Sequence, residues 1–209
     1  MTSPQIPKRR ALIGAILAAC LACILPNSSP ADPSLNLTRS ETSASLPKIQ
    51  PTWKTPSDQN MVFYLQRSMN RNTVVYTTQY DPKGALKKVP IKAYWRRYAE
   101  QGQTRALKWI ERKFAYGVKS RQNQNDKIWA VRFAALSNLP LELRHTGPNS
   151  AALWARINNR DYRLIYGYLD LDESGLITRV VQLRLVTFDP TLNKYVTHLI
   201  SVSDGDIRE

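Results

Sequence analysis

The chain has 209 residues, and its 30 Lys or Arg outnumber its 16 Asp or Glu to give a formal net charge of +14. This length allows one ordinary domain with appended segments, and the charge favours anionic partners over basic ones. With only two Cys and two His, the composition excludes a disulfide-rich scaffold and a multi-cysteine zinc module.

Residues 1–31 are predicted to be a bacterial export signal. Three basic residues, 8–10, precede an apolar run from Ala11 to Leu25. Fifteen residues extend only about 23 Å as a helix, which is too short for a hydrocarbon core of about 30 Å. The small residues before Ala31 provide a cleavage site. We therefore expect an exported protein, periplasmic or extracellular.

Cys20 indicates a second way of processing this segment. Residues 17–20 resemble the lipobox of bacterial lipoproteins, in which the Cys becomes the lipidated first residue. The chain stays apolar as far as Leu25, whereas a lipoprotein usually turns polar after the Cys, so ordinary cleavage after Ala31 is preferred. Cys20 and Cys23 both precede Ala31, so the cleaved chain would contain no thiol and no disulfide.

Residues 32–58 are predicted to be a disordered tether. Between Pro26 and Asp58, 17 of 33 residues are Pro, Ser or Thr, and apolar periodicity is weak. Such a composition buries too little apolar surface to offset the entropy lost on ordering. A single β-rich domain is accordingly expected over residues 59–209.

From Met61 onward the pattern indicates antiparallel strands. Two runs rich in β-branched and aromatic residues, 61–68 and 72–80, are followed by a turn at 81–84 and a returning strand at 90–98. Four further runs, separated by turns rich in Asp, Asn, Pro or Gly, form a predicted meander: 151–157, 162–171, 176–188 and 194–202. The predicted fold class is mostly β, an antiparallel β-sandwich or barrel-like meander.

One amphipathic helix is predicted over about 104–115, packed on this sheet, with Gly117 as its stop. At about 100° per residue, four apolar side chains share one face: Leu107, Ile110, Phe114 and Val118. Basic side chains gather opposite, with Trp109 beside them: Arg105, Lys108, Arg112 and Lys119. We expect the apolar face to be buried together with Ala93 and Trp95 of the preceding strand.

Positive charge is concentrated in one block of the sequence. Residues 87–132 contain 13 basic and 3 acidic residues, whereas 57–86 and 133–209 together contain 11 of each. A concentration of one sign attracts anions, although the same pattern could serve only to keep the protein soluble. The predicted basic binding face consists of Lys92, Arg96, Lys108, Trp109, Arg112 and Lys119.

Three segments resemble the bacterial family known as domain of unknown function 4833: "NTVVY" (72–76), "YWRRYAEQG" (94–102) and "LKWIERKFAYG" (107–117). The resemblance is best over about 60–117 and looser over the C-terminal meander. It implies no substrate, no catalytic residue and no cofactor, only that these segments belong to the defining part of the fold. Within them, a structural role is assigned to Trp95, Arg97, Tyr98, Glu111, Phe114 and Gly117.

The sequence contains no familiar catalytic, nucleotide-binding or zinc-protease motif. His198 alternates with apolar residues and is expected to be a hydrogen-bonded core residue, whereas His145 is expected in a solvated loop. Residues 170–175 imitate the start of a calcium-binding loop, but the twelfth position is Val181, so a hairpin turn is favoured. We expect no metal site.

Glu111 is an unusual carboxylate because it lies at the edge of the predicted apolar face. A half-buried charge normally has a partner, so pairing with Arg97 or another Arg is expected. A catalytic acid or base is the alternative reading of Glu111. Asp170 and Asp172 would share one face of a strand and are the second pair of candidate carboxylates.

The expected function is a non-enzymatic binding or structural module of the cell envelope. Its basic face would meet an anionic envelope component, either a lipid head group or an acidic glycan. A hydrolase acting on an envelope polymer, through Glu111 or the Asp170 and Asp172 pair, is the alternative. Aromatics interleaved with cations also fit nucleic acid, but an exported protein meets little of it.

Overall fold

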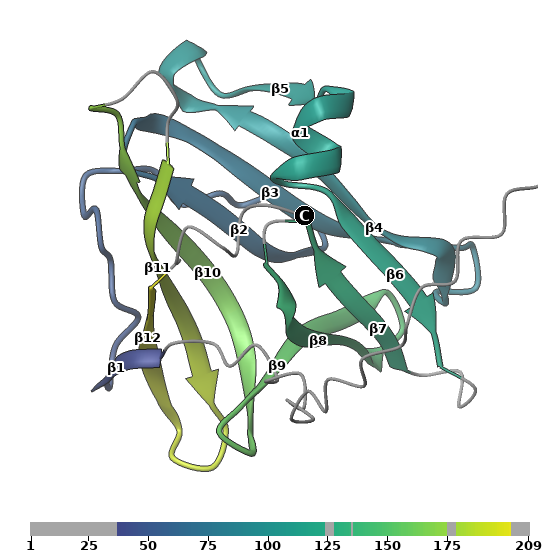
Figure 1. Ribbon diagram of the computed structural model, residues 1–209. Coiled ribbons are helices and arrows are strands. Elements are labelled where there is room, and N and C mark those ends of the chain that lie inside the picture. The colour runs from purple at the N-terminus through teal and green to yellow at the C-terminus, as the bar shows by residue number, and fades with distance from the viewer. Residues whose placement is uncertain (1–36, 124–127, 135, 175–178, 202–209) are drawn as a thin grey trace, which may run out of the picture. The chain divides into compact units, whose positions relative to one another are not determined.

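Strands predominate in the computed structural model (Figure 1), which describes four ranges of the chain: 37–123, 128–134, 136–174 and 179–201. All of these residues belong to one compact unit, Pro33–Glu209. The predicted export signal, with Cys20 and Cys23, lies outside the described residues. No helix within these ranges has the length and apolarity needed to cross a membrane.

Eight strands form two arms of one sheet, each built from consecutive antiparallel strands. The first arm contains β2 (Met61–Arg67), β3 (Asn70–Tyr80), β4 (Leu86–Arg97) and β5 (Gln103–Ala106). The second arm contains β6 (Val118–Gln122), β7 (Ile128–Phe133), β8 (Leu136–Gly147) and β9 (Ser150–Ile157).

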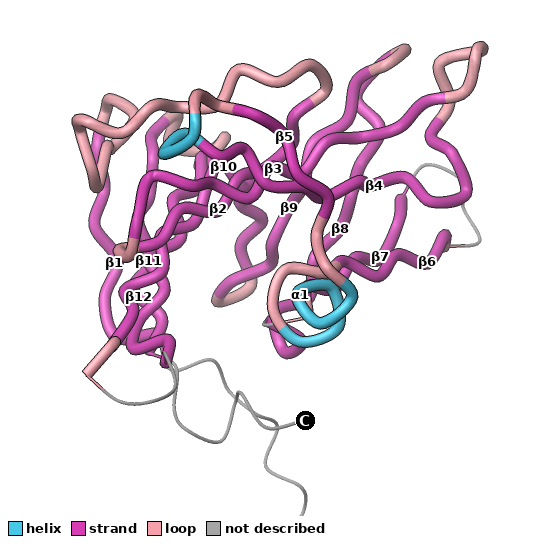
Figure 2. Tube along the Cα trace, turned by 90° about the horizontal axis from the view of Figure 1, so that it is seen from above, coloured by secondary structure: helices cyan, strands magenta, loops and turns pink. Residues whose placement is uncertain are grey.

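Strand β10 (Arg160–Asp172) joins the two arms. Its first residues pair antiparallel with β9, and residues further along pair in parallel with β2, so both arms start from the same edge of β10. The opposite edge of β10 pairs antiparallel with β11 (Arg179–Asp189). In turn, β11 pairs antiparallel with β12 (Lys194–Ser201), and β12 pairs antiparallel with β1 (Leu37–Ser43). The sheet therefore divides at β10, and Figure 2 shows the two arms as separate layers.

The main core lies between the facing arms. Phe63 of β2 stacks on Phe133 of β7 with ring centroids 5.4 Å apart, and Tyr76 of β3 lies 4.8 Å from the same Phe133 ring. Alternate residues of β2, β3, β4, β7, β8 and β9 enter this core, because successive side chains of a strand point to opposite faces. The predicted fold class, a mostly β antiparallel fold with one short helix, is confirmed.

The C-terminal meander is also confirmed, since β9 to β12 pair antiparallel in sequence order. Asn158 and Asn159 form the two-residue turn between β9 and β10, with φ angles of 49° and 62°. Asn tolerates this left-handed region better than most residues, which suits a tight hairpin. Gly84, with φ of 80°, ends the predicted turn at 81–84. Strands β1, β5, β6, β7 and β8 were not predicted from the sequence.

The predicted helix over 104–115 is shorter in the structure. Helix α1 spans Trp109–Phe114, and residues 103–106 form β5. Leu107 is buried in an extended link, so it does not share a helical face with Ile110 and Phe114, which are 52% and 56% exposed. The prediction that these two side chains are buried is therefore wrong. Helix α1 ends at Phe114 with Ala115 as its C-cap, and the predicted stop, Gly117, follows two residues later. A Cβ at Gly117 would lie 1.7 Å from the Arg112 carbonyl oxygen, so this close approach of the backbone requires glycine.

The predicted disordered tether is wrong for its described part. Residues 37–43 form β1, and the segment 44–58 covers the face of the sheet that points away from the main core. Three of its side chains, Leu46, Ile49 and Trp53, pack against a second core cluster: Tyr64, Tyr166, Tyr168 and Val186. A composition rich in Pro, Ser and Thr did not prevent these few apolar residues from anchoring the segment.

Candidate functional site

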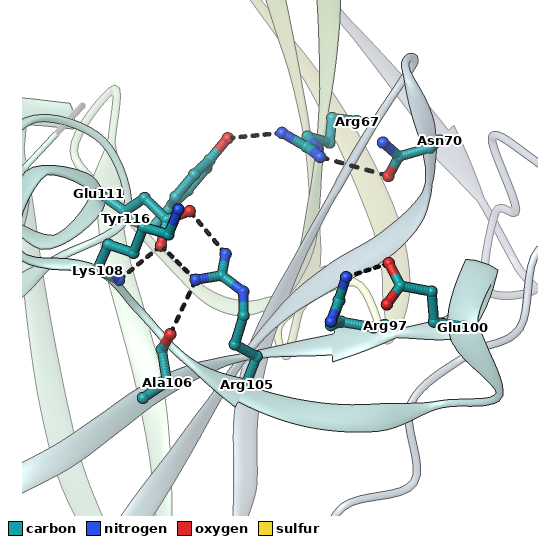
Figure 3. Close-up of polar contacts among 9 residues, drawn as sticks. All are labelled: Arg67, Asn70, Arg97, Glu100, Arg105, Ala106, Lys108, Glu111 and Tyr116. Carbon is teal, nitrogen blue, oxygen red and sulfur yellow. Dashed lines mark hydrogen bonds and ion pairs between the residues drawn. The ribbon is translucent and has the colours of Figure 1, made fainter.

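Trp95 lies at the centre of a cluster of arginines on the core side of the first arm. We call Trp95 and its neighbours Arg67, Arg97, Arg105, Glu111 and Tyr116 the Trp95 cluster. The guanidinium carbons of Arg67 and Arg105 lie 4.5 Å and 5.8 Å from the centroid of its ring. Tyr116, which follows α1, meets the same indole edge-on at 5.0 Å. Figure 3 shows Arg67, Arg105 and Tyr116 with their polar partners.

Strand alternation explains why these side chains meet. On β2, Arg67 follows Phe63 and Leu65 at intervals of two residues and continues their core-facing side. On β4, Arg97 follows the buried Trp95 in the same way, and the β4–β5 register places Arg105 opposite Trp95. Three arginines from three strands therefore share one face near α1.

Glu111 joins this cluster to helix α1. Its carboxylate accepts two hydrogen bonds from Arg105, at 2.7 Å and 3.2 Å, and one from the backbone N–H of Lys108 at 2.6 Å. Burial acts to raise the pKa of Glu111, but the bonds from Arg105 and Lys108 outweigh burial and lower this pKa below its usual value. The predicted pairing of Glu111 with an arginine is confirmed, with Arg105 as the partner.

Arg97, the partner named first for Glu111, pairs instead with Glu100 of the short 3-10 helix η1 (Tyr98–Glu100). Arg67 has weaker partners: it donates to the Tyr116 hydroxyl at 3.4 Å and to the Asn70 side-chain oxygen at 3.3 Å. Its buried Nε atom has no hydrogen-bond partner among the described residues.

Helix α1 presents its remaining side chains to solvent. Trp109, Ile110 and Phe114 are exposed, and so are three cations of the same segment: Lys108, Arg112 and Lys113. The Lys113 ammonium lies 5.1 Å from the centroid of the Phe114 ring. We call these six residues, Lys108, Trp109, Ile110, Arg112, Lys113 and Phe114, which surround most of the helix, the α1 surface. It unites three residues of the predicted basic face: Lys108, Trp109 and Arg112.

Lys92 and Arg96 lie elsewhere. They alternate with the core-facing Trp95 and so point to the other face of β4. There Arg96 is bonded to Asp58, which also accepts a hydrogen bond from the Tyr94 hydroxyl at 2.7 Å. Burial and Asp58 raise the pKa of Tyr94 to about 12. Arg96 is thus neutralised by a residue of the segment that was predicted to be a tether.

Lys119 belongs to a third location, on the second arm. Its neighbour Val118 packs on the core, so Lys119 points outward, directly opposite Arg132 of β7. No carboxylate of the described residues pairs with either cation, and like charges placed opposite each other repel. The six residues of the predicted basic face therefore fall on three separate surfaces.

The two histidines have structural positions. His198 is 1% exposed and hydrogen-bonds Ser40 and Thr187, each at 3.1 Å, so the predicted core histidine is confirmed. Its burial lowers its pKa to about 4. His145 is not in a loop but in β8, partly buried, where its Nε2 donates to the Gly84 carbonyl at 3.1 Å.

Residues 170–172 of the calcium-like segment belong to β10, which pairs antiparallel with β11. The predicted turn extends into residues 175–178, which lie outside the described residues. Asp170 accepts a hydrogen bond from Arg184 at 2.8 Å. No group of three His, Cys, Asp or Glu in the described ranges is arranged to hold a metal ion.

Residues 63–198 match the family described as domain of unknown function DUF4833. The chain belongs to this family. The DUF4833 match runs from β2 into β12, so it includes the Trp95 cluster, the α1 surface and the C-terminal meander. No curated protein and no solved structure is significantly similar to the chain.

Two members of the Trp95 cluster, Arg67 and Tyr116, were missed by sequence reasoning. For Arg67 a signal was present, since it continues the core-facing alternation of β2 in the way that Arg97 continues that of β4. For Tyr116 no local pattern was available, because its position depends on the turn after α1 and on a hydrogen bond that its carbonyl accepts from Tyr76 at 3.1 Å.

Proposed function

We propose that this DUF4833 protein is a binding module of the cell envelope whose α1 surface takes an anionic envelope component. The observation that carries the proposal is the exposure of large apolar side chains beside cations on one short helix. Three of the seven large apolar side chains that are exposed in the described part of the chain lie in α1. A local concentration of this kind usually marks an interaction surface.

The charge of α1 supports an anionic partner. Lys108, Arg112 and Lys113 are exposed, whereas the acid of this segment, Glu111, is neutralised by Arg105. The α1 surface therefore has three uncompensated positive charges. They would attract the phosphates of lipid head groups or the carboxylates of acidic glycans.

Of these two partners, a lipid surface suits the α1 surface better. Trp109, Ile110 and Phe114 are between 52% and 65% exposed, and apolar area gains roughly 25 cal/mol per Å2 when it leaves water. Short basic segments with aromatic side chains bind at the head-group boundary through both effects. The predicted export signal, with or without lipidation of Cys20, would bring the protein to such membranes.

The hydrolase alternative has less support from the geometry. A general acid needs a raised pKa, but the pKa of Glu111 is lowered and its carboxylate is occupied by Arg105. Asp170 is likewise paired with Arg184. Both carboxylates therefore have structural partners in place of a catalytic environment.

Vesicle co-sedimentation tests the proposal. The mature protein should bind vesicles that contain phosphatidylglycerol, bind pure phosphatidylcholine weakly, and lose binding as salt rises because screening shortens the reach of charge. Charge reversal of Lys108, Arg112 and Lys113 to Glu should weaken binding at least tenfold. The same reversal of three exposed lysines of β4, Lys87, Lys88 and Lys92, is the matched control.

Three outcomes separate the partners. Loss of vesicle binding in a Trp109→Ser, Ile110→Ser, Phe114→Ser variant would show that the apolar side chains contact lipid. Retention on beads coated with alginate, an acidic glycan, together with no vesicle binding, would assign the α1 surface to glycans. Equal binding by the α1 reversal and the β4 control would refute the proposal.

A further inference from the structure

Arg67 differs from the other arginines of the described chain. Each other arginine that is partly buried bonds a carboxylate: Arg96 with Asp58, Arg97 with Glu100, Arg105 with Glu111, Arg144 with Asp161 and Glu142, and Arg184 with Asp170. Arginines whose described side chains have no carboxylate partner are otherwise exposed: Arg71, Arg112, Arg121, Arg132 and Arg163. Arg67 alone is partly buried and bonds no carboxylate of the described residues.

A second arginine of the same protein, Arg144, allows a comparison with Arg67. Arg144 stacks over Trp154 at 4.9 Å, much as Arg67 stacks over Trp95 at 4.5 Å. The Arg144 guanidinium also has charged partners, Asp161 at 2.6 Å and Glu142 at 2.8 Å. A guanidinium stacked on an indole is thus accompanied by carboxylates at one location and by neutral acceptors at the other.

The hydrogen bonds of Arg67 are poor for a charged donor. Charge-assisted N–H···O bonds are usually about 2.7–2.9 Å long, whereas those to Tyr116 and Asn70 are 3.4 Å and 3.3 Å. The Nε atom is buried without a partner. Removing a cation from water is unfavourable unless an anion and well-formed hydrogen bonds replace the water.

The neighbouring charged residues leave the charge of Arg67 uncompensated. Arg97 and Arg105 lie on the same face of the first arm, and their partners Glu100 and Glu111 neutralise them. Three cations against two carboxylates leave one positive charge, that of Arg67. We propose that Arg67, stacked on Trp95, is the anchor of a binding site for one oxyanion group, a carboxylate or a phosphate. This site is independent of the α1 surface.

The chemistry of Arg67 fits this class of ligand. A guanidinium presents its donors in a planar fork that matches two oxygens of a carboxylate or phosphate. Stacking on Trp95 fixes the plane of that fork. The bound oxyanion replaces the long bonds to Tyr116 and Asn70 with shorter, charge-assisted ones, and it compensates the single positive charge of the cluster.

Titration with inorganic phosphate and with glucuronate, each against chloride at constant ionic strength, tests the site. Calorimetry should show saturable binding of at least one probe, and the stronger probe distinguishes phosphate from carboxylate. In nitrogen-15 NMR spectra the side-chain Nε–Hε signal of Arg67 should shift along the titration. Arg67→Gln should weaken binding at least tenfold, and Arg67→Lys should weaken it as well because an ammonium lacks the fork.

Arg163→Gln is the matched control, because Arg163 also stacks on an aromatic ring, Phe188 at 5.2 Å, but is exposed. It should bind as the wild type does, and so should the charge reversal of the α1 surface. Unchanged affinity in Arg67→Gln, or no saturable binding of either probe by the wild type, would overturn the proposal. If Arg67→Gln does not fold, the NMR shift of Arg67 in the wild type decides alone.

Discussion

Glu111 and Arg105 connect helix α1 to strand β5 through two hydrogen bonds, and Glu111 also bonds the backbone N–H of Lys108 at the helix start. One carboxylate therefore caps the helix and neutralises an arginine that stacks on Trp95. The orientation of the α1 surface depends on this residue, since α1 has only six residues and none of them is buried.

Glu111→Gln should destabilise the protein by about 1–3 kcal/mol. The variant keeps the side-chain shape but leaves the partly buried Arg105 without its charge partner and weakens the helix cap. Urea unfolding gives the difference in free energy. Glu100→Gln, which removes the more exposed partner of Arg97, is the control and should change stability by less than about 1 kcal/mol. A smaller effect for Glu111 than for Glu100 would contradict the role given to Glu111.

The segment 44–58 should contribute to stability. Trp53 packs against Tyr168 with ring centroids 5.9 Å apart, and the Pro47 carbonyl accepts a hydrogen bond from Tyr166 at 2.6 Å. Trp53→Ala should cost about 1–3 kcal/mol, less than a fully buried aromatic because Trp53 keeps part of its surface in water. Thermal unfolding measures the loss. Lys54→Ala, at an exposed neighbouring position, should leave the melting temperature nearly unchanged.

Truncation of Phe114 and of Phe63 should change the free energy of unfolding by very different amounts. Phe114 is 56% exposed, so Phe114→Ala should change the free energy of unfolding by less than about 0.5 kcal/mol. Phe63 is 1% exposed and stacks on Phe133, so Phe63→Ala should cost about 3–5 kcal/mol. Denaturant titrations of both variants provide the comparison. A large loss in Phe114→Ala would mean that α1 packs on the protein in solution.

The sequence correctly predicted those strands that local features mark, namely alternating side chains and turn residues. Alternation and turn residues are enough to place β2, β3, β4 and the C-terminal meander. The helix was predicted too long because 104–106 fits a helical period equally well, and only pairing with β4 makes it a strand. That pairing is a tertiary contact, which outweighs a short periodic signal.

The site was less predictable, because part of the predicted helix is a strand and because other contacts join residues that are distant in sequence. Glu111 could be expected to pair with an arginine, but Arg105 was placed on the opposite side of a helix that does not form there. Trp53 meets Tyr168 across more than a hundred residues, which composition cannot reveal. The basic face was predicted as one surface because charge was counted along the chain. Alternation along β4 instead points Arg96 to the face opposite Trp95, whereas Lys108 lies at the start of α1.

Between about pH 6.5 and pH 4, the protein should become less stable as the pH falls, because His198 is buried in its neutral form. Burial lowers the pKa of His198 from 6.5 to about 4 in the folded protein, while the unfolded chain keeps the ordinary value. Between these values the unfolded state binds more protons, so the free energy of unfolding decreases as the pH falls. The stability that depends on neutral His198 is fully present above about pH 6.5, and roughly 3 kcal/mol of it is lost near pH 4.

Urea unfolding of the wild type at several pH values between 7 and 4.5 measures this slope, in a range above the titration of most carboxylates. His198→Gln should flatten it, because the replacement has no group that titrates there. His145→Gln should keep the slope, because His198 remains buried between Ser40 and Thr187 in that variant. An equal slope in wild type and His198→Gln would assign the pH dependence to other groups and would contradict the neutral, buried state of His198.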